Sequence, residues 1–227
     1  MRKWEELPEE FQRDEVRPYY EHLREHRVSL VLKRIMDLLA ACLLLLLLFP
    51  FMLVIGIIVG VTSPGGVFFC QERVTAYGRH FRIIKFRTMA AGAESRGSQV
   101  TTEGDSRVTG VGRFLRKVRL DELPQLLNII KGDMSIVGTR PEVPRYVAAY
   151  TPEMLATLLL PAGVTSKASI EYKDEERLLS EGSDVDRIYV EQVLPAKMKY
   201  NLAYMMEYSL GKDLLLMLQT VVAVWRT

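Results

Sequence analysis

The longest apolar stretch of the chain lies in its N-terminal third. Residues 38–71 contain no charged side chain, and residues 43–48 are all leucine. A helix that spans a bilayer needs about 20 apolar residues, so this stretch is long enough to enter a membrane. It starts too late and runs too long for a cleavable signal peptide. The pattern therefore predicts a membrane-embedded helix.

Pro50 lies near the middle of this stretch, where a proline removes one backbone hydrogen bond and clashes with the preceding turn. Basic residues flank the stretch on both sides, and positive charge marks the ends of a membrane segment that stay in the cytoplasm. We therefore predict a re-entrant helix over residues 31–66, broken at Pro50, that enters and leaves the bilayer on one face. A straight transmembrane anchor is the alternative. The flanking basic residues are Lys33 and Arg34 before the stretch and Arg73, Arg79, Arg82, Lys85 and Arg87 after it.

The pattern after the apolar stretch predicts a small β-hairpin. Residues 67–74 and 80–86 read as two strands joined by a turn at Tyr77. Lys85 and Arg87 alternate with apolar neighbours, so both would project from one face of a strand, either into a site or into solvent. The polar, glycine-containing residues that follow, 90–105, predict a loop.

Helical patterns dominate the remainder of the chain. Residues 144–160, 189–208 and 212–225 are predicted helices, and residues 173–187 form a charged, exposed stretch. The last helix has almost no charge, but its fourteen residues are too few to span a bilayer. We favour a position on the membrane surface for it over a place in the core. The predicted fold class is α+β: a mainly helical single domain with a small β-hairpin, a re-entrant membrane hairpin and interfacial amphipathic helices.

Composition removes several classes of function. The 227 residues carry a formal net charge of +2, which argues against a nucleic-acid binder that works through gross basicity. Cys42 and Cys70 are the only cysteines, and their positions fit neither a metal site nor a disulfide framework. His22 and His26 are four residues apart, as metal ligands can be, but their charged surroundings favour an exposed helix face. No Ser-His-Asp arrangement is visible.

Two acidic residues and several basic ones converge within residues 116–141. Five apolar residues there recur at helical spacing, with Asp121 where the helix would begin and Gly132 where it would end. Pro124 falls in the first turn, so the Asp121 carboxylate has one capping target fewer than an ordinary N-cap. A helix N-terminus attracts anions, which makes the segment a candidate anion site. The plain alternative is that Asp121 and Glu122 are ordinary helix-start residues. The surrounding basic residues are Arg116, Lys117, Arg119 and Arg140.

This string resembles the catalytic segment of the bacterial sugar transferases that load polyprenyl phosphate, the small monotopic phosphoglycosyl transferases. The Asp-Glu pair at residues 121–122, the Lys-Gly-Asp-Met-Ser of residues 131–135 and the Gly-Thr-Arg-Pro of residues 138–141 match that family in order and spacing. The Lys-Phe-Arg-Thr-Met of residues 85–89 matches another of its motifs. The resemblance covers about residues 31–226.

The chain departs from the family pattern at two places. Phe49 precedes Pro50 where the family has serine, and Pro161-Ala162 stand where the family has Arg-Pro. These departures affect the bend of the membrane helix and the recognition of the donor. The family's minimal members start close to Lys33. The resemblance therefore implies three parts: an N-terminal extension (1–30), the re-entrant membrane helix (31–66) and a cytosolic catalytic domain with membrane-surface helices (67–227).

The resemblance implies an enzyme that moves a sugar-1-phosphate from a UDP-sugar to undecaprenyl phosphate and releases UMP, the first membrane step of bacterial glycoconjugate synthesis. Asp121 would be the nucleophile and would carry the phosphosugar. Asp121 and Glu122 would also hold Mg²⁺, and Glu122 would serve either the metal or a proton transfer. The expected location is the cytoplasmic face of the bacterial inner membrane. The residues expected to contact substrate are Lys85, Arg87, Arg116, Arg119 and Arg140.

Two other classes of function stay open. One is an inactive membrane scaffold with a transferase-like fold. The other is an ordinary glycosyltransferase, which moves a sugar without its phosphate and releases a nucleoside diphosphate instead of a monophosphate. The sequence leaves open the donor sugar, the glycan pathway, the oligomeric state and the role of residues 1–30.

Overall fold

The computed structural model describes residues 1–63, 65–93, 100–102, 104–172, 179 and 184–225. Within them the fold is mainly helical, with two small two-stranded sheets. This confirms the predicted α+β class. The predicted loop over residues 90–105 and the charged stretch over residues 173–187 lie partly outside the described residues.

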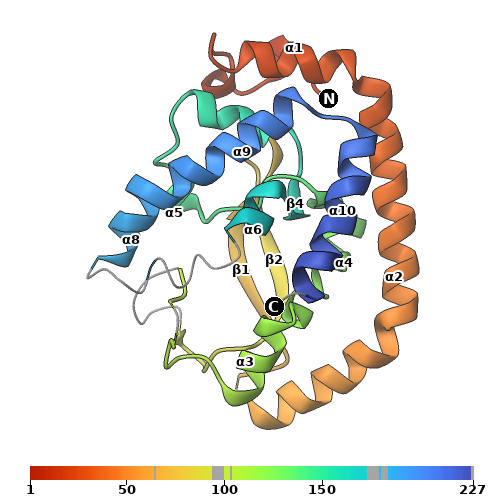
Figure 1. The fold of residues 1–227 in the computed structure, drawn as a ribbon, viewed down its shortest axis with the longest axis vertical. Coiled ribbons are helices and arrows are strands. Elements are labelled where there is room, and N and C mark those ends of the chain that lie inside the picture. The colour runs from red at the N-terminus through yellow and green to blue at the C-terminus, as the bar shows by residue number, and fades with distance from the viewer. Residues whose placement is uncertain (64, 94–99, 103, 173–178, 180–183, 226–227) are drawn as a thin grey trace.

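One long helix, α2 (Arg27–Thr62), contains most of the predicted membrane segment. Its 36 residues stay helical across Pro50 and do not divide into the two predicted helices. Figure 1 shows that α2 instead curves around the edge of the molecule. A proline costs a helix one backbone hydrogen bond, which bends the helix but need not end it. Among the helices that the structure describes, α2 alone is long and apolar enough to cross a membrane.

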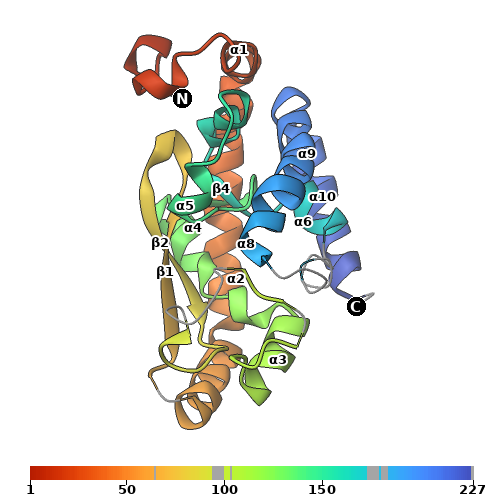
Figure 2. The same cartoon turned by 90° about the vertical axis from the view of Figure 1, so that its left-hand side faces the viewer.

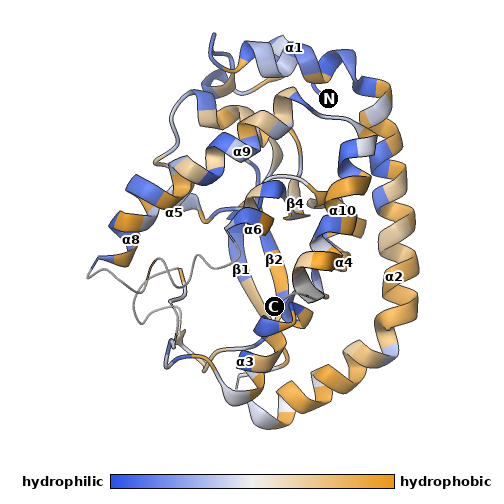
Figure 3. Ribbon diagram, in the orientation of Figure 1, coloured by the Kyte–Doolittle hydropathy of each residue, from blue (hydrophilic) through white to orange (hydrophobic). Residues whose placement is uncertain are grey.

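α2 packs against the rest of the chain on both sides of Pro50. Before the proline, Ala41 lies in a core cluster with Ile129. After it, Val59 lies in a second cluster with Leu115. The opposite face of α2 is apolar and exposed along its length (Figure 3). Its exposed side chains include Leu39, Leu43, Leu46, Leu47, Phe49, Phe51, Leu53, Val54, Ile57, Ile58 and Val61.

The predicted hairpin is confirmed to within one residue. β1 (Phe68–Val74) and β2 (His80–Phe86) pair antiparallel around a turn in which Tyr77 has a φ of 58°. A second sheet pairs β3 (Met134–Val137) parallel with β4 (Ala162–Thr165). The sequence pattern does not predict β4, because four residues are too few to show a period.

Short helices connect and cover the sheets. The predicted helix over residues 144–160 is divided, because α5 (Pro144–Val147) ends early and a 3₁₀ helix (Glu153–Leu159) follows. The predicted helix over residues 189–208 is a π-helix (Tyr189–Val193) that continues into α9 (Leu194–Met206). The other described helices are α3 (Gly110–Lys117), α4 (Gln125–Lys131), α6 (Lys167–Glu171), α8 (Val185–Ile188) and α10 (Leu210–Trp225). In Figure 2 the β1–β2 hairpin and helices α8, α9 and α10 lie on opposite sides of α4 and β4.

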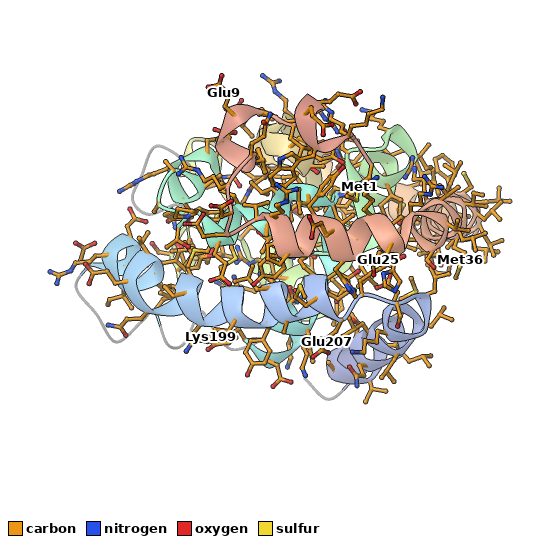
Figure 4. The ribbon with its side chains drawn as sticks, turned by 90° about the horizontal axis from the view of Figure 1, so that it is seen from above. Met1, Glu9, Glu25, Met36, Lys199 and Glu207 are labelled. Carbon is orange, nitrogen blue, oxygen red and sulfur yellow. The ribbon has the colours of Figure 1, made fainter. Side chains whose placement is uncertain are left out.

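Residues 1–26 pack against the remainder of the chain. They form two 3₁₀ turns (Trp4–Glu6 and Glu9–Phe11) and helix α1 (Arg17–Glu25). Pro18 lies in the first turn of α1, where a proline is tolerated because its missing N–H has no helical partner there. Figure 4 shows α1 beside α9, which it contacts. One core cluster joins these parts and includes Leu7, Phe11, Val16, Tyr20, Leu23, Leu159, Met205 and Tyr208.

A buried polar cluster ties the start of α2 to β3 and α10. Nζ of Lys33 lies 2.6 Å from Oδ2 of Asp213, and the Tyr204 hydroxyl donates to the other oxygen of Asp213 at 2.8 Å. One turn along α2, Asp37 accepts a hydrogen bond from Oγ of Ser135 at 2.6 Å. Buried charges are stable when they are paired and hydrogen-bonded. The cluster therefore fixes how α2 lies against the domain.

Arg34 connects α2 to the end of α4. Its guanidinium donates to the carbonyls of Ile129 at 2.7 Å and Ile130 at 3.2 Å, in the last turn of α4, where basic side chains commonly bind the helix carbonyls. Gly132 ends α4 with a φ of 87°, as predicted. The apolar helix thus holds in place the short helix that follows the acidic pair.

Candidate active site

Asp121 and Glu122 lie in a 3₁₀ turn (Leu120–Glu122), not at the N-cap of a long helix as predicted. α4 begins only at Gln125. Pro124 has no N–H and cannot donate to the carbonyl of Leu120, so this carbonyl accepts a 3₁₀ bond from the Leu123 amide at 3.3 Å. The proline therefore delays the α-helix and places the acidic pair ahead of it.

Glu122 is held between two cations. Nζ of Lys85, on β2, lies 3.1 Å from Oε1 of Glu122, and both Nη atoms of Arg140 donate to the carboxylate. Burial would raise the pKa of Glu122, but Arg140 and Lys85 outweigh it and hold this pKa well below its usual range. Burial also lowers the pKa of Lys85. Glu122 is therefore an ionised bridge between β2 and the chain after β3.

Asp121 is only 7% exposed, yet no described residue forms a hydrogen bond or ion pair with its carboxylate. Burial raises the pKa of Asp121, and the negative charge of Glu122 raises it further. A buried carboxylate without a partner is costly unless something binds it. The arrangement leaves both oxygens of Asp121 available to a ligand.

Both acids line a cavity of about 800 Å³. Every residue expected from the sequence to contact substrate also lines it: Lys85, Arg87, Arg116, Arg119 and Arg140. Arg87 differs from the others, because its guanidinium donates to the carbonyls of Gly66 at 2.9 Å and Phe68 at 3.1 Å. It thereby braces the start of the hairpin. Pro50 is not among the lining residues.

Two kinds of polar side chain line the cavity. Arg113 and Lys117 of α3 add positive charge to that of Arg116. Thr165, Ser169 and Thr220 add hydroxyl groups, and Oγ1 of Thr165 lies 2.7 Å from Oγ1 of Thr220. The cations suit phosphate oxygens, and the hydroxyl groups suit a sugar or a base with many hydrogen-bonding groups.

Sequence reasoning named Lys117 only as a basic neighbour of the acidic pair, and it did not assign Arg113, Ser169 or Thr220 to the site. Arg113 and Lys117 carried a signal, because they alternate with the apolar positions of an amphipathic helix, Val111 and Leu115. The segment that departs from the family pattern, 161–166, forms β4 and the start of α6. There Oγ of Ser166 caps the helix by accepting from the Ser169 amide at 3.0 Å.

Among the described residues, no group of three or more His, Cys, Asp or Glu side chains could hold a metal ion. His22 and His26 lie at α1, and their rings are 4.5 Å apart. Both are half-buried and not exposed as predicted.

Comparison with known proteins identifies relatives for nearly the whole chain. It is 34% identical over 212 residues to a UDP-N-acetylgalactosamine-undecaprenyl-phosphate N-acetylgalactosaminephosphotransferase of Aeromonas hydrophila. This match covers 88% of this chain and 47% of the relative. It is 35% identical over 198 residues to a UDP-glucose:undecaprenyl-phosphate glucose-1-phosphate transferase of Caulobacter vibrioides. That match covers 86% of this chain and 70% of the relative. An Escherichia coli protein of the same description is 33% identical, and the matched region is 40% of its length.

The chain thus spans about half the length of the Aeromonas relative. The model of the family described as bacterial sugar transferase matches residues 28–227, which begin at the start of α2. By this match and by its curated relatives, the chain belongs to the bacterial sugar transferase family.

Proposed function

We propose that this protein is a phosphoglycosyl transferase, which moves a sugar-1-phosphate from a UDP-sugar to undecaprenyl phosphate and releases UMP. The names of its relatives support both substrates. The observation that carries the proposal is the Asp121 carboxylate. It lies on the cavity without a partner among the described residues, beside Lys85, Arg116 and Arg140.

The reaction has two halves. A carboxylate oxygen of Asp121 attacks the sugar-linked phosphorus, and the bond from that phosphorus to the bridging oxygen breaks, so that UMP leaves with the electron pair. An oxygen of undecaprenyl phosphate then attacks the same phosphorus and releases the Asp121 carboxylate. Lys85, Arg116 and Arg140 stabilise the charge that builds on the phosphate oxygens in both steps. Glu122 keeps Lys85 and Arg140 in place for this task.

A magnesium ion, when bound, neutralises the charge of the diphosphate. Such an ion keeps several waters and needs only one or two protein carboxylates besides the phosphates. Asp121 fits this requirement, because its oxygens have no other described partner. Glu122 fits it poorly, since Lys85 and Arg140 already occupy its oxygens. We therefore assign the protein ligand of the metal to Asp121 and a bridging role to Glu122.

We further propose that the protein is monotopic and lies on the cytoplasmic face of the bacterial inner membrane. Both halves of α2 pack on the same domain, which supports a helix that returns to the side it entered from. The outer face of α10 is also apolar and supports a position at the membrane surface. Its exposed residues include Leu214, Leu215, Leu218, Val221 and Val222. The lipid tail of the acceptor can then stay in the bilayer throughout.

The released nucleotide tests the proposal against its rivals. Purified protein in lipid nanodiscs is given a panel of UDP-sugars together with undecaprenyl phosphate, and the nucleotide products are separated. We expect UMP with at least one donor and none from Asp121→Asn. Release of UDP would identify an ordinary glycosyltransferase. An inactive scaffold would turn over no donor, although the intact acidic pair and its cations speak against that reading.

A further inference from the structure

A second buried polar cluster lies on the cavity wall, next to Arg140. Glu142 is 6% exposed, and its Oε1 accepts a hydrogen bond from the Tyr189 hydroxyl at 2.5 Å. Nζ of Lys197 lies 3.7 Å from the same oxygen and donates to the Tyr189 hydroxyl at 3.2 Å. All three residues line the cavity, yet the chemistry above gives them no task.

The chain that carries Arg140 is also held through its backbone. Nη1 of Arg73 donates to the carbonyl of Pro141 at 2.9 Å, and the Val74 amide donates to the carbonyl of Glu142 at 3.0 Å. The end of β1 thus fixes the main chain on one side. On the other side, the side chain of Glu142 is anchored to a helix 47 residues further along the sequence.

We propose that Glu142 and Tyr189 are positioning residues that hold Arg140 in register with the donor phosphates, a role that rests on the proposed function. Arg140 and Glu142 are separated only by Pro141, whose fixed φ limits how the segment can rotate. Anchoring Glu142 therefore restricts the position of Arg140. Tyr189 begins a π-helical turn, and such turns are rare and frequently lie at functional sites.

Charge argues that Glu142 acts through Arg140 and does not touch the donor. A carboxylate repels the negatively charged diphosphate. The Oε1 of Glu142 is already shared by Tyr189 and Lys197, and its Oε2 lies 3.9 Å from Nη1 of Arg73. An anchored anion beside the site is suited to orienting its cationic neighbours.

Tyr189→Phe tests the proposal because it removes only the hydroxyl and keeps the ring that packs 4.7 Å from that of Tyr146. The probe is UDP, and its affinity is measured by calorimetry in nanodiscs. We expect UDP to bind roughly five- to tenfold more weakly, as for the loss of one hydrogen bond. If Tyr189 acts through Arg140, the double variant with Arg140→Lys should bind UDP no more weakly than Arg140→Lys alone.

Hydrogen exchange of the Val74 amide gives a readout that does not depend on the proposed function. This amide donates to the Glu142 carbonyl, so it should exchange faster in Tyr189→Phe than in the wild type. Tyr19→Phe is the matched control, because it removes a tyrosine-to-glutamate hydrogen bond of 2.6 Å on the surface, to Glu153. It should change neither quantity.

Each outcome decides the proposal. Losses of UDP affinity that multiply in the double variant, or an unchanged affinity in Tyr189→Phe, would overturn it. If Tyr189→Phe does not fold, Glu142→Gln serves in its place, since the amide keeps the size of the side chain and gives up its charge. If wild-type protein binds no UDP, the proposed function fails, and the exchange of Val74 still tests whether Tyr189 holds the segment.

Discussion

Asp121 and Glu122 are neighbours in the chain, but their surroundings move their pKa values in opposite directions. Burial and the charge of Glu122 raise the pKa of Asp121, whereas Arg140 and Lys85 hold the pKa of Glu122 well below its usual range. Such a split assigns different roles to paired acids. A nucleophilic Asp121 must be ionised. Its half-reaction should therefore slow, as the pH falls, at a higher pH than an ordinary aspartate would require.

Glu122→Gln should move this acid limb to lower pH. The change removes the negative charge that raises the pKa of Asp121, and it leaves Lys85 and Arg140 to stabilise the Asp121 carboxylate. The measurement is the pH dependence of the first burst of UMP release, since only ionised Asp121 contributes. The overall rate should also fall, because Lys85 and Arg140 lose their bridge. An acid limb that stays in place or moves upward would show that Asp121 does not limit the step.

Arg140→Lys should weaken donor binding with little loss of folded protein. Lysine keeps the charge but lacks the planar fork that makes bidentate contacts with phosphate or carboxylate. We expect a loss of about 1–3 kcal/mol in donor or transition-state binding, the range for hydrogen bonds to charged groups. Arg145→Lys is the control, because Arg145 is exposed and pairs with Asp186 at 2.9 Å. Unaltered donor kinetics in Arg140→Lys would remove Arg140 from the site.

At the residue scale the sequence predicts which charged side chains gather, but not how they pair. The spacing around Asp121 identifies the acids and their cations. It does not show that Glu122 is taken up by Lys85 and Arg140, because Lys85 lies 37 residues away in sequence. The contact of Glu142 with Tyr189 is equally remote, and neither residue lies in a pattern that marks it.

Among the elements, those with a clear period are the predictable ones. The β1–β2 hairpin has seven residues in each strand, with exposure alternating along β1 and over the first four residues of β2, and the sequence predicts it almost to the residue. β4 and the divided helix after Pro144 are too short to show a period. The helix expected to begin at Asp121 begins at Gln125 instead, because the missing N–H of Pro124 prevents the first α-helical bond.

The position of α2 in the membrane can be tested with single cysteines. After Cys42 and Cys70 are replaced by alanine, cysteine is introduced at Val28 or at Glu72, which are both exposed and lie on either side of the apolar stretch. Both should resist an impermeant thiol reagent in intact cells and react after lysis. Labelling of only one in intact cells would show a true span. Pro50→Leu should favour spanning, because it restores a backbone hydrogen bond.

The buried pair at the start of α2 should matter more for stability than a surface pair. Asp213→Asn leaves Lys33 buried without the charge 2.6 Å from it. Breaking a buried pair in this way costs about 3–5 kcal/mol of unfolding free energy. Glu207→Gln breaks the exposed pair with Lys212 and should cost less than about 1 kcal/mol. Thermal unfolding in nanodiscs would compare the two. Equal effects would show that the cluster does not fix α2.

On the scale of the whole molecule, the structure places a charged cavity beside an extensive apolar exterior. The outer faces of α2 and α10 are apolar (Figure 3), while both cations and hydroxyl groups line the cavity. Such a surface suits an enzyme whose one substrate is water-soluble and whose other substrate stays in the bilayer. Residues 1–26 contribute buried side chains to the core cluster beside α9. Removing them should therefore expose apolar side chains of that cluster and lower the stability of the domain.

A covalent phosphosugar on Asp121 is the central claim, and the first half-reaction tests it most directly. Enzyme in nanodiscs is given a UDP-sugar that it turns over, with magnesium but no undecaprenyl phosphate. We expect one equivalent of UMP in a burst and a gain in protein mass of one phosphosugar, which digestion places on the peptide with Asp121 and Glu122. Chelation of magnesium should abolish the burst, and Asp121→Asn should form no adduct although it folds.

A direct transfer to the acceptor, with Asp121 only holding the metal, predicts no UMP without undecaprenyl phosphate. The absence of both the burst and the adduct, in enzyme that is active with both substrates, would contradict the covalent mechanism.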